Sequence, residues 1–265
     1  FLHYGKDGCN RHVLIDECRE LFGEIYEQIP ELPFCNIWTA MQLSSRLPKG
    51  ALFHMGVSNT RRCWNMFQLP ESVESACNVG CCGIDGCVST LVGASLVNPD
   101  RLCYVVVGDL TFFYDLNSLG NHHIGTNLRV MLVNNGRGTE FRLGIHHCNV
   151  FGDDADKYMA AAGHFGNKSP LLVKHYAEDL GFHYLSATTK EEFMTALSNF
   201  TNPQLSDHSM ILEVFTDSKD ESEALYLMSH IQSDAKGMVR SKLKDAVRNV
   251  AGETGINAIK KILKK

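Results

Sequence analysis

Two apolar segments of the sequence are each followed by a polar side chain, at a spacing typical of neighbouring parallel strands. Residues 102–107 (LCYVVV) come shortly before Asp109, and residues 128–133 (LRVMLV) come shortly before Asn135. The intervening residues 111–120 have the character of a helix. Parallel strands are joined by a crossover, usually a helix, and their carboxyl ends meet at one edge of the sheet. The sequence therefore predicts that Asp109 and Asn135, 26 positions apart, reach the same edge.

A carboxylate and a carboxamide at that edge are suited to Mg²⁺. This ion takes hard oxygen ligands and is usually held by one or two carboxylates together with phosphate oxygens. The backbone amides of Leu110 and Thr111, which open the following helix, would face a bound diphosphate. Taken alone, Asp109 is explained as the cap of a helix, and Asn134-Asn135-Gly136 is explained as a turn. The pair at this spacing favours the metal site.

The same spacing resembles the signature of enzymes that depend on thiamine diphosphate (ThDP), in which Gly-Asp-Gly is followed at a similar distance by Asn-Asn. Leu110 replaces the third residue of the first motif. Three further segments agree with the resemblance: Gly56-Val57-Ser58-Asn59, Gly83-Ile84-Asp85-Gly86 with Ser89-Thr90, and Tyr114-Asp115-Leu116-Asn117. Together they look like the C-terminal, diphosphate-binding domain of the 2-succinyl-5-enolpyruvyl-6-hydroxy-3-cyclohexene-1-carboxylate synthases of menaquinone biosynthesis, over about residues 47–215.

The resemblance implies a cofactor site with ThDP and Mg²⁺. The metal ligands would be Asp109, Asn135 and the main-chain carbonyl of Arg137. Ile84 matches the apolar wedge that holds ThDP in a bent form, although outside this motif it would be an ordinary core isoleucine at a helix start. Main-chain groups near Gly56, Cys82 and Ile84 would hold the aminopyrimidine. The implied cofactor-binding residues are Gly56, Ser58, Cys82, Ile84, Gly108, Asp109, Leu110, Thr111, Asn135 and Arg137.

Substrate recognition is implied at Ser58 and Arg62, which match a serine and an arginine that bind substrate carboxylates in the menaquinone synthases. An arginine fork suits a dicarboxylic 2-oxo acid, but an arginine on a helix surface explains Arg62 equally well. Two departures weigh against a succinyl-type donor. A second arginine of the family falls at Val79, and Glu140 replaces an apolar residue that lines the active site.

The chain has 12 histidines, of which two fall in a long loop predicted over 136–153. His146 and His147 lie there, where a lid over the site is expected, and acid–base catalysis is the minority alternative for them. His122 and His123 are expected to face solvent. The candidate catalytic residues are Ile84, Ser58, Arg62, His146 and His147.

Strand-like and helix-like segments alternate between residues 51 and 215, with strands expected over 51–54, 102–107, 128–133, 182–185 and 210–215. Helices are expected over 11–29, from Asn36 as a candidate cap to Leu47, and over 84–97, 154–163, 171–180 and 190–200. This predicts an α/β fold, a doubly wound and mostly parallel sheet with helices on both faces. We expect residues 1–33 to be a helix and linker from a preceding region, 34–235 the ThDP- and Mg²⁺-binding domain, and 236–265 a helical tail. The tail has nine basic and two acidic residues in a chain of net charge -5. We expect it to pack on its own or a neighbouring subunit rather than on nucleic acid or a membrane.

Ten cysteines without a secretory signal indicate a reducing cytoplasm and no disulfide framework. Four of them cluster, but without paired C-x-x-C spacing, so close packing is favoured over a metal site. They are Cys77, Cys81, Cys82 and Cys87. No apolar run approaches the ~20 residues of a transmembrane helix.

The function implied by the resemblance is that of a 2-oxo acid decarboxylase and carboligase, a homodimer or homotetramer that acts on a 2-oxo acid and an acceptor. In this family the catalytic glutamate belongs to an N-terminal pyrimidine-binding domain or subunit, which nothing here matches. We therefore expect the chain, which begins at Phe1, to be inactive alone. The alternatives are a non-catalytic cofactor-binding or assembly module, and a ThDP decarboxylase with a different 2-oxo acid. A plain nucleotide-binding Rossmann domain is disfavoured, because no G-x-G-x-x-G follows the first strand.

Overall fold

The computed structural model describes residues 10–80, 82–144, 146–158 and 169–231. The chain divides into two compact units, Pro33–Leu225 and a smaller one made of residues 1–32 and 226–265. The smaller unit contains helix α1 (Asn10–Glu27), close to the helix predicted over 11–29. The predicted tail at 236–265 lies outside the described residues, and the predicted domain boundaries remain predictions.

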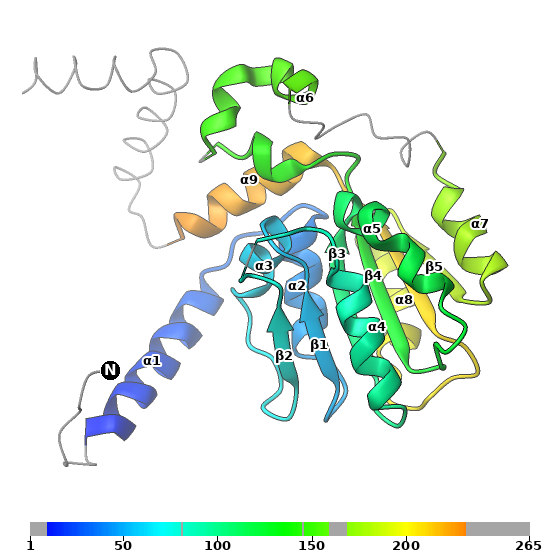
Figure 1. Ribbon diagram of the computed structural model, residues 1–265. Helices are drawn as coiled ribbons and strands as arrows, with labels where there is room; N and C mark the ends of the chain where they lie inside the picture. The colour runs from blue at the N-terminus through cyan, green and yellow to red at the C-terminus, as the bar shows by residue number, and fades with distance from the viewer. Residues whose placement is uncertain (1–9, 81, 145, 159–168, 232–265) are drawn as a thin grey trace, which may run out of the picture. The chain divides into compact units, whose positions relative to one another are not determined.

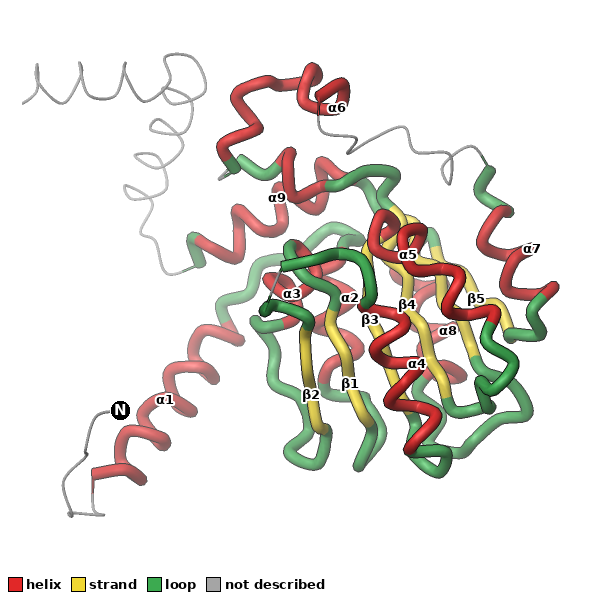
Figure 2. The backbone as a smooth tube through the Cα atoms, in the orientation of Figure 1, coloured by secondary structure: helices red, strands yellow, loops and turns green. Residues whose placement is uncertain are grey.

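The larger unit is built on a six-stranded sheet with the order β2-β1-β3-β4-β6-β5 (Figures 1 and 2). Every neighbouring pair of strands is parallel, which confirms the predicted α/β class. Strands β3, β4 and β6 are buried on both faces, and this explains their nearly continuous apolar sequences. The strands are β1 (Leu52–Met55), β2 (Glu74–Cys77), β3 (Cys103–Gly108), β4 (Leu128–Asn134), β5 (His183–Ala187) and β6 (Met210–Phe215).

Helices connect the strands and continue beyond the last of them. The α-helices after α1 are α2 (Asn36–Ser44), α3 (Asn59–Trp64), α4 (Cys87–Val97), α5 (Asp109–Asp115), α6 (Ala155–Tyr158), α7 (Leu172–Asp179), α8 (Lys190–Phe200) and α9 (Ser218–Ser229). Three 3₁₀ segments complete the described elements: η1 (Leu116–Gly120), η2 (Thr139–Arg142) and η3 (His147–Asp154). None of the described helices is long and apolar enough to cross a membrane.

Helices cover both faces of the sheet. On the face toward the viewer in Figure 1, α4, α5 and α7 pack on the sheet through residues such as Leu91, Phe112 and Val173. On the other face, Phe53 of β1 lies 5.1 Å from Trp64 of α3 between ring centroids. Trp38 packs edge-on against α8 and is 8% exposed, while Trp64 is 1% exposed. Two apolar layers therefore hold the sheet between them.

The strand order reverses between β1 and β3. The chain passes from β1 outward to β2 and then returns to β3 on the other side of β1, so the crevice beyond the carboxyl ends of β1 and β3 is a topological switch point. Gly56, just after β1, donates its N–H to the Val106 carbonyl at 2.7 Å. A Cβ on Gly56 would lie 3.2 Å from that oxygen and 3.3 Å from Cα of Val107, so a side chain here would push the backbone of β3 by a few tenths of an ångström.

Several predicted element boundaries were wrong. The helix expected from Ile84 begins at Cys87, because Gly86 with φ +90° forms its N-cap and leaves Ile84 in a loop. Asn36 does not cap α2; Cys35 is the N-cap, and the helix ends at Ser44 rather than Leu47.

The C-terminal part of the larger unit also differs from the prediction. The predicted loop at 136–153 contains the 3₁₀ segments η2 and η3. The helix predicted over 154–163 is seen as α6, and the rest of that range is mostly outside the described residues. Helix α9 was not predicted at all.

Candidate functional site

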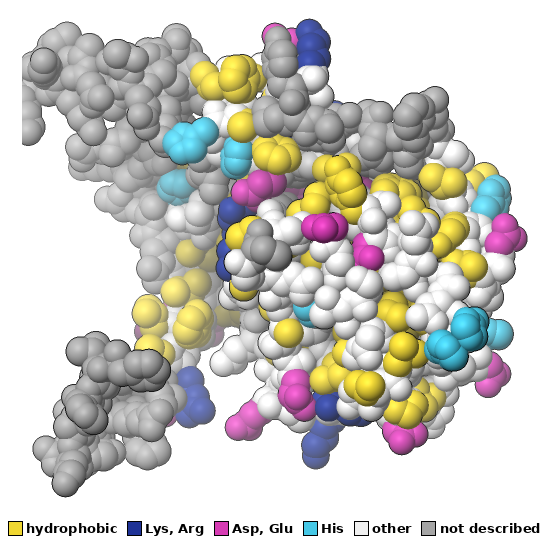
Figure 3. Space-filling view, in the orientation of Figure 1, with side chains coloured by type: hydrophobic (Ala, Val, Ile, Leu, Met, Phe, Trp, Pro, Cys, Tyr) yellow, Lys and Arg dark blue, Asp and Glu magenta, His cyan; other side chains and the backbone are white. Residues whose placement is uncertain are grey.

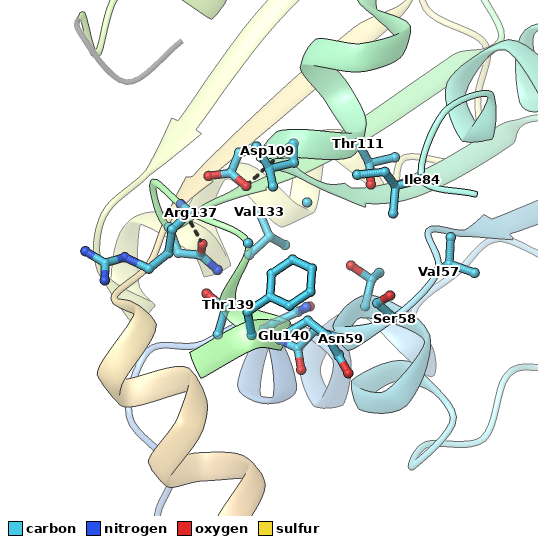
Figure 4. Close-up of a pocket in the computed structure, with 17 residues that line it drawn as sticks. Val57, Ser58, Asn59, Ile84, Asp109, Thr111, Val133, Arg137, Thr139 and Glu140 are labelled. Carbon is cyan, nitrogen blue, oxygen red and sulfur yellow. Dashed lines mark hydrogen bonds between the residues drawn. The ribbon is translucent and has the colours of Figure 1, made fainter. Parts of the chain in front are cut away.

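A pocket opens at the carboxyl edge of the sheet, at the switch point (Figure 4). Its walls come from the segments that follow β1, β3 and β4, together with the loop before α4 and the start of α2. Eight predicted site residues line it: Ser58, Ile84, Gly108, Asp109, Leu110, Thr111, Asn135 and Arg137. The pocket volume is about 120 Å³.

Asp109 and Asn135 enter this pocket from neighbouring strands, since Gly108 pairs with Val133 in the parallel register of β3 and β4. Asp109 is 2% exposed, and its Oδ1 accepts the N–H of Leu110 at 2.8 Å. Oδ1 of Asn135 accepts the N–H of Arg137 at 3.4 Å. Asp109 thus makes a local hydrogen bond of the kind found at a helix start, and Asn135 makes one of the kind found in a turn. The two side chains also line the same pocket.

The preceding asparagine, Asn134, anchors this loop in the protein interior. Its Nδ2 donates to Oε1 of Glu213 at 2.7 Å, and the Tyr184 hydroxyl donates to Oε2 at 2.7 Å. Burial raises the pKa of Glu213 against the lowering effect of these two hydrogen bonds. Gly136 then turns the chain with φ +81°. Alternation along the strand thus places Asn134 in the interior and leaves Asn135 to the pocket.

Arg137 presents its main chain rather than its guanidinium to the pocket. Nη1 of Arg137 lies 3.3 Å from Oδ2 of Asp156, and the side chain extends away from the other labelled residues in Figure 4. This geometry is compatible with the predicted use of its carbonyl oxygen.

Gly108 leaves open space at the end of β3. No atom of the described residues lies within 4 Å of a Cβ placed on it, and its φ of -79° is available to any residue. Neither packing nor backbone conformation therefore requires glycine here, whereas close approach of a ligand would. Ile84 packs partly against the core and partly lines the pocket, so a bulky aliphatic side chain stands between the two.

Ser58 adopts a backbone conformation that disfavours any side chain, with φ +63° and ψ -123°. Its carbonyl accepts the N–H of Arg62 at 3.1 Å in the first turn of α3, but its hydroxyl does not cap that helix. Strained residues of this kind gather at functional sites, where the surrounding structure maintains them.

Arg62 forms a bidentate ion pair with Glu140 of η2. Nη1 lies 2.6 Å from Oε2 and Nη2 lies 3.0 Å from Oε1. The hydrogen bonds with Glu140 raise the pKa of Arg62 despite partial burial. Glu140 lines the pocket and Arg62 is not among the lining residues, so this pair joins α3 to the loop after β4.

Other predicted site residues lie outside the pocket lining. Gly56 is packed against β3, as described above, and Cys82 is exposed with φ +53°. His146 is half-buried, with its ring edge-on to Phe141 at 5.3 Å and its Nδ1 accepting the N–H of Cys148 at 3.1 Å. His147 is exposed.

The neighbouring histidines His122 and His123 lie on the surface, whereas the clustered cysteines differ in their exposure. His122 and His123 are exposed as predicted, and histidine side chains are visible on the surface in Figure 3. Of the cysteine cluster, Cys81 lies outside the described residues, and burial raises the pKa of Cys77 and Cys87. Within the described ranges, no three His, Cys, Asp or Glu side chains form a metal-binding group.

Asn36 lines the pocket and depends on a carboxyl group that the sequence did not indicate. Oε1 of Glu221, on α9, accepts the backbone N–H of Asn36 at 3.0 Å and the hydroxyl of Thr216 at 2.7 Å. Oδ1 of Asn36 accepts the indole N–H of Trp64 at 2.9 Å. Glu221 lies 185 positions from Asn36, so no local pattern could reveal this contact. Pocket residues missed by sequence reasoning include Asn36, Asn59, Thr60 and Thr139.

No protein-family model matches the chain. The chain is 34% identical over 196 residues to the 2-succinyl-5-enolpyruvyl-6-hydroxy-3-cyclohexene-1-carboxylate synthase of Bacteroides fragilis, a match that covers 74% of this chain and 34% of that protein. The synthases of the same name from Phocaeicola vulgatus and Christiangramia forsetii are 34% identical over 200 residues and 33% identical over 199 residues. These two matches cover 74% and 75% of this chain, and 34% and 33% of the relatives. The chain thus spans about a third of the length of the curated relatives it matches.

Proposed function

We propose that this chain, which is homologous to the 2-succinyl-5-enolpyruvyl-6-hydroxy-3-cyclohexene-1-carboxylate synthases, is the part of a ThDP-dependent enzyme that holds the cofactor's diphosphate and Mg²⁺. The observation that carries the proposal is the meeting of Asp109 and Asn135 in one pocket at the ends of adjacent strands. When bound, ThDP supplies the electron sink for decarboxylation of a 2-oxo acid and for transfer of the remaining carbon unit to an acceptor.

The pocket residues fit the hard ligands that Mg²⁺ prefers. The Asp109 carboxylate, the Asn135 side-chain oxygen and the Arg137 carbonyl would hold the ion. Asp109 is almost fully buried, so a bound cation would compensate the charge of its carboxylate in a position that water hardly reaches. The open space at Gly108 would admit the diphosphate close to the chain.

Ile84 would then act through its bulk alone. It stands between the core and the pocket, so it can hold a bent cofactor without donating or accepting a hydrogen bond. Ser58, which also lines the pocket, would contribute its hydroxyl to the cofactor or the substrate.

The volume of about 120 Å³ supports a site that needs a second wall. Complete small-molecule sites usually enclose ~300–1,000 Å³. We infer that a pyrimidine-binding region, as a domain or a partner subunit, supplies the missing wall and the catalytic glutamate. Within such an assembly, a homodimer or homotetramer, the chain would serve a menaquinone-type carboligase. Alone it would bind ThDP weakly and be inactive.

The experiment is isothermal titration calorimetry of the chain with ThDP in the presence of Mg²⁺. We expect Asp109→Ala and Asn135→Ala to weaken binding by at least roughly 10- to 100-fold, the loss typical of residues that merely support metal ligands. Chelation of Mg²⁺ should have the same effect. Asp100→Ala, an exposed carboxylate before β3 at the opposite edge of the sheet, is the matched control. Unchanged ThDP affinity in Asp109→Ala would overturn the proposal.

A further inference from the structure

Glu213 places a buried carboxylate in β6, a strand whose other residues are apolar. It is 1% exposed, and each of its oxygens accepts a hydrogen bond from an uncharged donor. Nδ2 of Asn134 donates to Oε1 at 2.7 Å, and the hydroxyl of Tyr184 donates to Oε2 at 2.7 Å. An apolar residue would fill this position without the desolvation cost of a carboxylate. The presence of the carboxylate therefore directs attention to the groups that it holds.

Asn134 is the last residue of β4 and directly precedes Asn135, a candidate metal ligand. Side chains alternate along a strand, so Asn134 lies on the same face as Leu132, in the interior, while Asn135 lines the pocket. Leu132 is paired with Glu213 in the register of β4 and β6, so the bond from Asn134 to Glu213 is a diagonal contact between neighbouring strands. This bond fixes the direction of Asn134 and, through the alternation, that of Asn135.

Tyr184 extends the hydrogen-bonded network to β5. Its side chain packs against the same core layer as Leu132. Burial, together with the bond to Glu213, raises the pKa of Tyr184, so the hydroxyl keeps its proton and remains a donor at neutral pH. The backbone N–H of Thr216 also donates to the Asn134 carbonyl at 3.1 Å. Three adjacent strands, β5, β6 and β4, are thus connected through side chains that end at the loop of the candidate metal ligands.

We propose that Glu213 is a positioning residue for the cation: by holding Asn134, it directs the side-chain oxygen of Asn135 and the carbonyl of Arg137 toward the site. This inference rests on the proposed function, because it assumes that Mg²⁺ and the diphosphate bind in this pocket. Glu213 is not among the lining residues, so it acts through Asn134 rather than on the ion. Loss of a group that orients metal ligands typically lowers metal affinity by roughly 10- to 100-fold.

Three variants separate this role from simple packing. Glu213→Val keeps a residue suited to a buried strand but removes the acceptor of the Asn134 amide. Asn134→Asp places two carboxylates against each other. The double variant, Asn134→Asp with Glu213→Gln, exchanges the amide and the carboxylate. Its glutamine can donate to the new aspartate and still accept the hydroxyl of Tyr184, so the network is restored.

Asn127→Asp is the matched control. Asn127 directly precedes β4, at the opposite edge of the sheet, and is 2% exposed. Its Nδ2 donates to the carbonyls of Asn98 and Arg101, both at 3.0 Å. The substitution therefore removes a buried amide donor at the other end of the same strand, far from the pocket.

The measurement is calorimetric titration of the chain with ThDP in the presence of Mg²⁺, at a temperature below the unfolding transition of each variant. Glu213→Val and Asn134→Asp should each weaken ThDP binding by roughly tenfold or more, and the double variant should return to within about threefold of wild type. Asn127→Asp should lower the Tm and leave ThDP affinity within about threefold of wild type.

The Mg²⁺ requirement gives a second readout that does not depend on turnover. At fixed ThDP, the Mg²⁺ concentration for half-maximal binding should rise in Glu213→Val and in Asn134→Asp. The rise in Asn134→Asp is diagnostic, because an added negative charge near the cation would by itself lower this concentration.

Wild-type affinity in Glu213→Val, no recovery in the double variant, or an equal loss in Asn127→Asp would each overturn the inference and leave Glu213 as a stabilising residue of the core. These outcomes are distinct from failure of the proposed function. That failure would appear as ThDP binding that does not depend on Asp109, whereas loss of binding in Asp109→Ala alone would leave the proposed function standing.

Discussion

Glu221 on α9 accepts the backbone N–H of Asn36 at the start of α2, at 3.0 Å and across 185 positions of sequence. Glu221 is 1% exposed, and its second oxygen, Oε2, has no hydrogen-bond partner among the described residues. Asn36 also receives the indole N–H of Trp64 and lines the pocket. The buried side chain of Glu221 thus connects α9 to Asn36, a residue that lines the candidate site.

This acid should make folding stability depend on pH. Burial, with a smaller contribution from the charge of Asp109, raises the pKa of Glu221 to about 7. In the unfolded chain the carboxyl titrates near its ordinary pKa of about 4.3. Between these two values the native state binds more protons than the unfolded state, so the free energy of unfolding falls as pH rises. The contribution is complete below about 4.3 and is lost by about pH 7.

Glu221→Gln should remove this pH-dependent loss of stability. Urea unfolding from about pH 4 to pH 8 should show the variant gaining stability relative to wild type as pH rises, by at most about 4 kcal/mol. Any fixed cost of the new amide is the same at each pH and does not alter the trend. Glu223→Gln, exposed on the same helix, should follow the wild-type curve. Parallel curves for Glu221→Gln and wild type would refute the prediction.

Two glycines at the ends of β1 and β3 should respond differently to the same substitution. Gly56→Ala places a methyl group against Val106 and Val107 backbone atoms, and we expect a cost of about 1–3 kcal/mol in urea unfolding. In the part of the chain that the structure describes, the methyl group of Gly108→Ala meets no atom within 4 Å, so the stability of this variant should be unchanged or about 0.4–1 kcal/mol higher. Its affinity for ThDP with Mg²⁺ should nevertheless fall, because the methyl group occupies pocket space. Loss of stability in Gly108→Ala with unchanged affinity would show that this glycine is structural.

The strained backbone of Ser58 should yield a stabilising substitution. The backbone strain of a non-glycine residue in this conformation costs about 1–3 kcal/mol, and glycine removes that strain. Glycine also costs roughly 0.5–1 kcal/mol of stability, because it makes the unfolded chain more flexible. Ser58→Gly should therefore raise the free energy of unfolding by about 1 kcal/mol. Ser58→Ala, which loses the hydroxyl but keeps φ at +63°, should show no such gain. Equal stabilities of the two variants would argue against backbone strain as the cause.

The parts of the fold that sequence reasoning predicted have local signals. Continuous apolar runs indicated β3, β4 and β6, and the helix at Lys190–Phe200 was predicted with its observed bounds. The spacing between Asp109 and Asn135 placed both at one sheet edge, because a right-handed crossover brings successive parallel strands into contact.

The features that were missed depend on backbone details or on distant residues. Gly86 at φ +90° delays the start of α4, and no periodic pattern encodes that conformation. Helix α9 has a weakly apolar face, and its first turn contains Glu221, a charged residue that sequence reasoning assigns to the surface. Its burial follows from contacts with Asn36 and Thr216.

By itself, the sequence determined the α/β class and the strand ends from which Asp109 and Asn135 emerge, since strand and helix periodicity are local properties of a chain. Only the tertiary structure decided that Arg62 is paired with Glu140 and that Glu221 is buried beneath Asn36. The physical reason is that an ion pair or a buried hydrogen bond depends on the distance between side chains in space. That distance is set by the packing of helices on the sheet rather than by the residues between them.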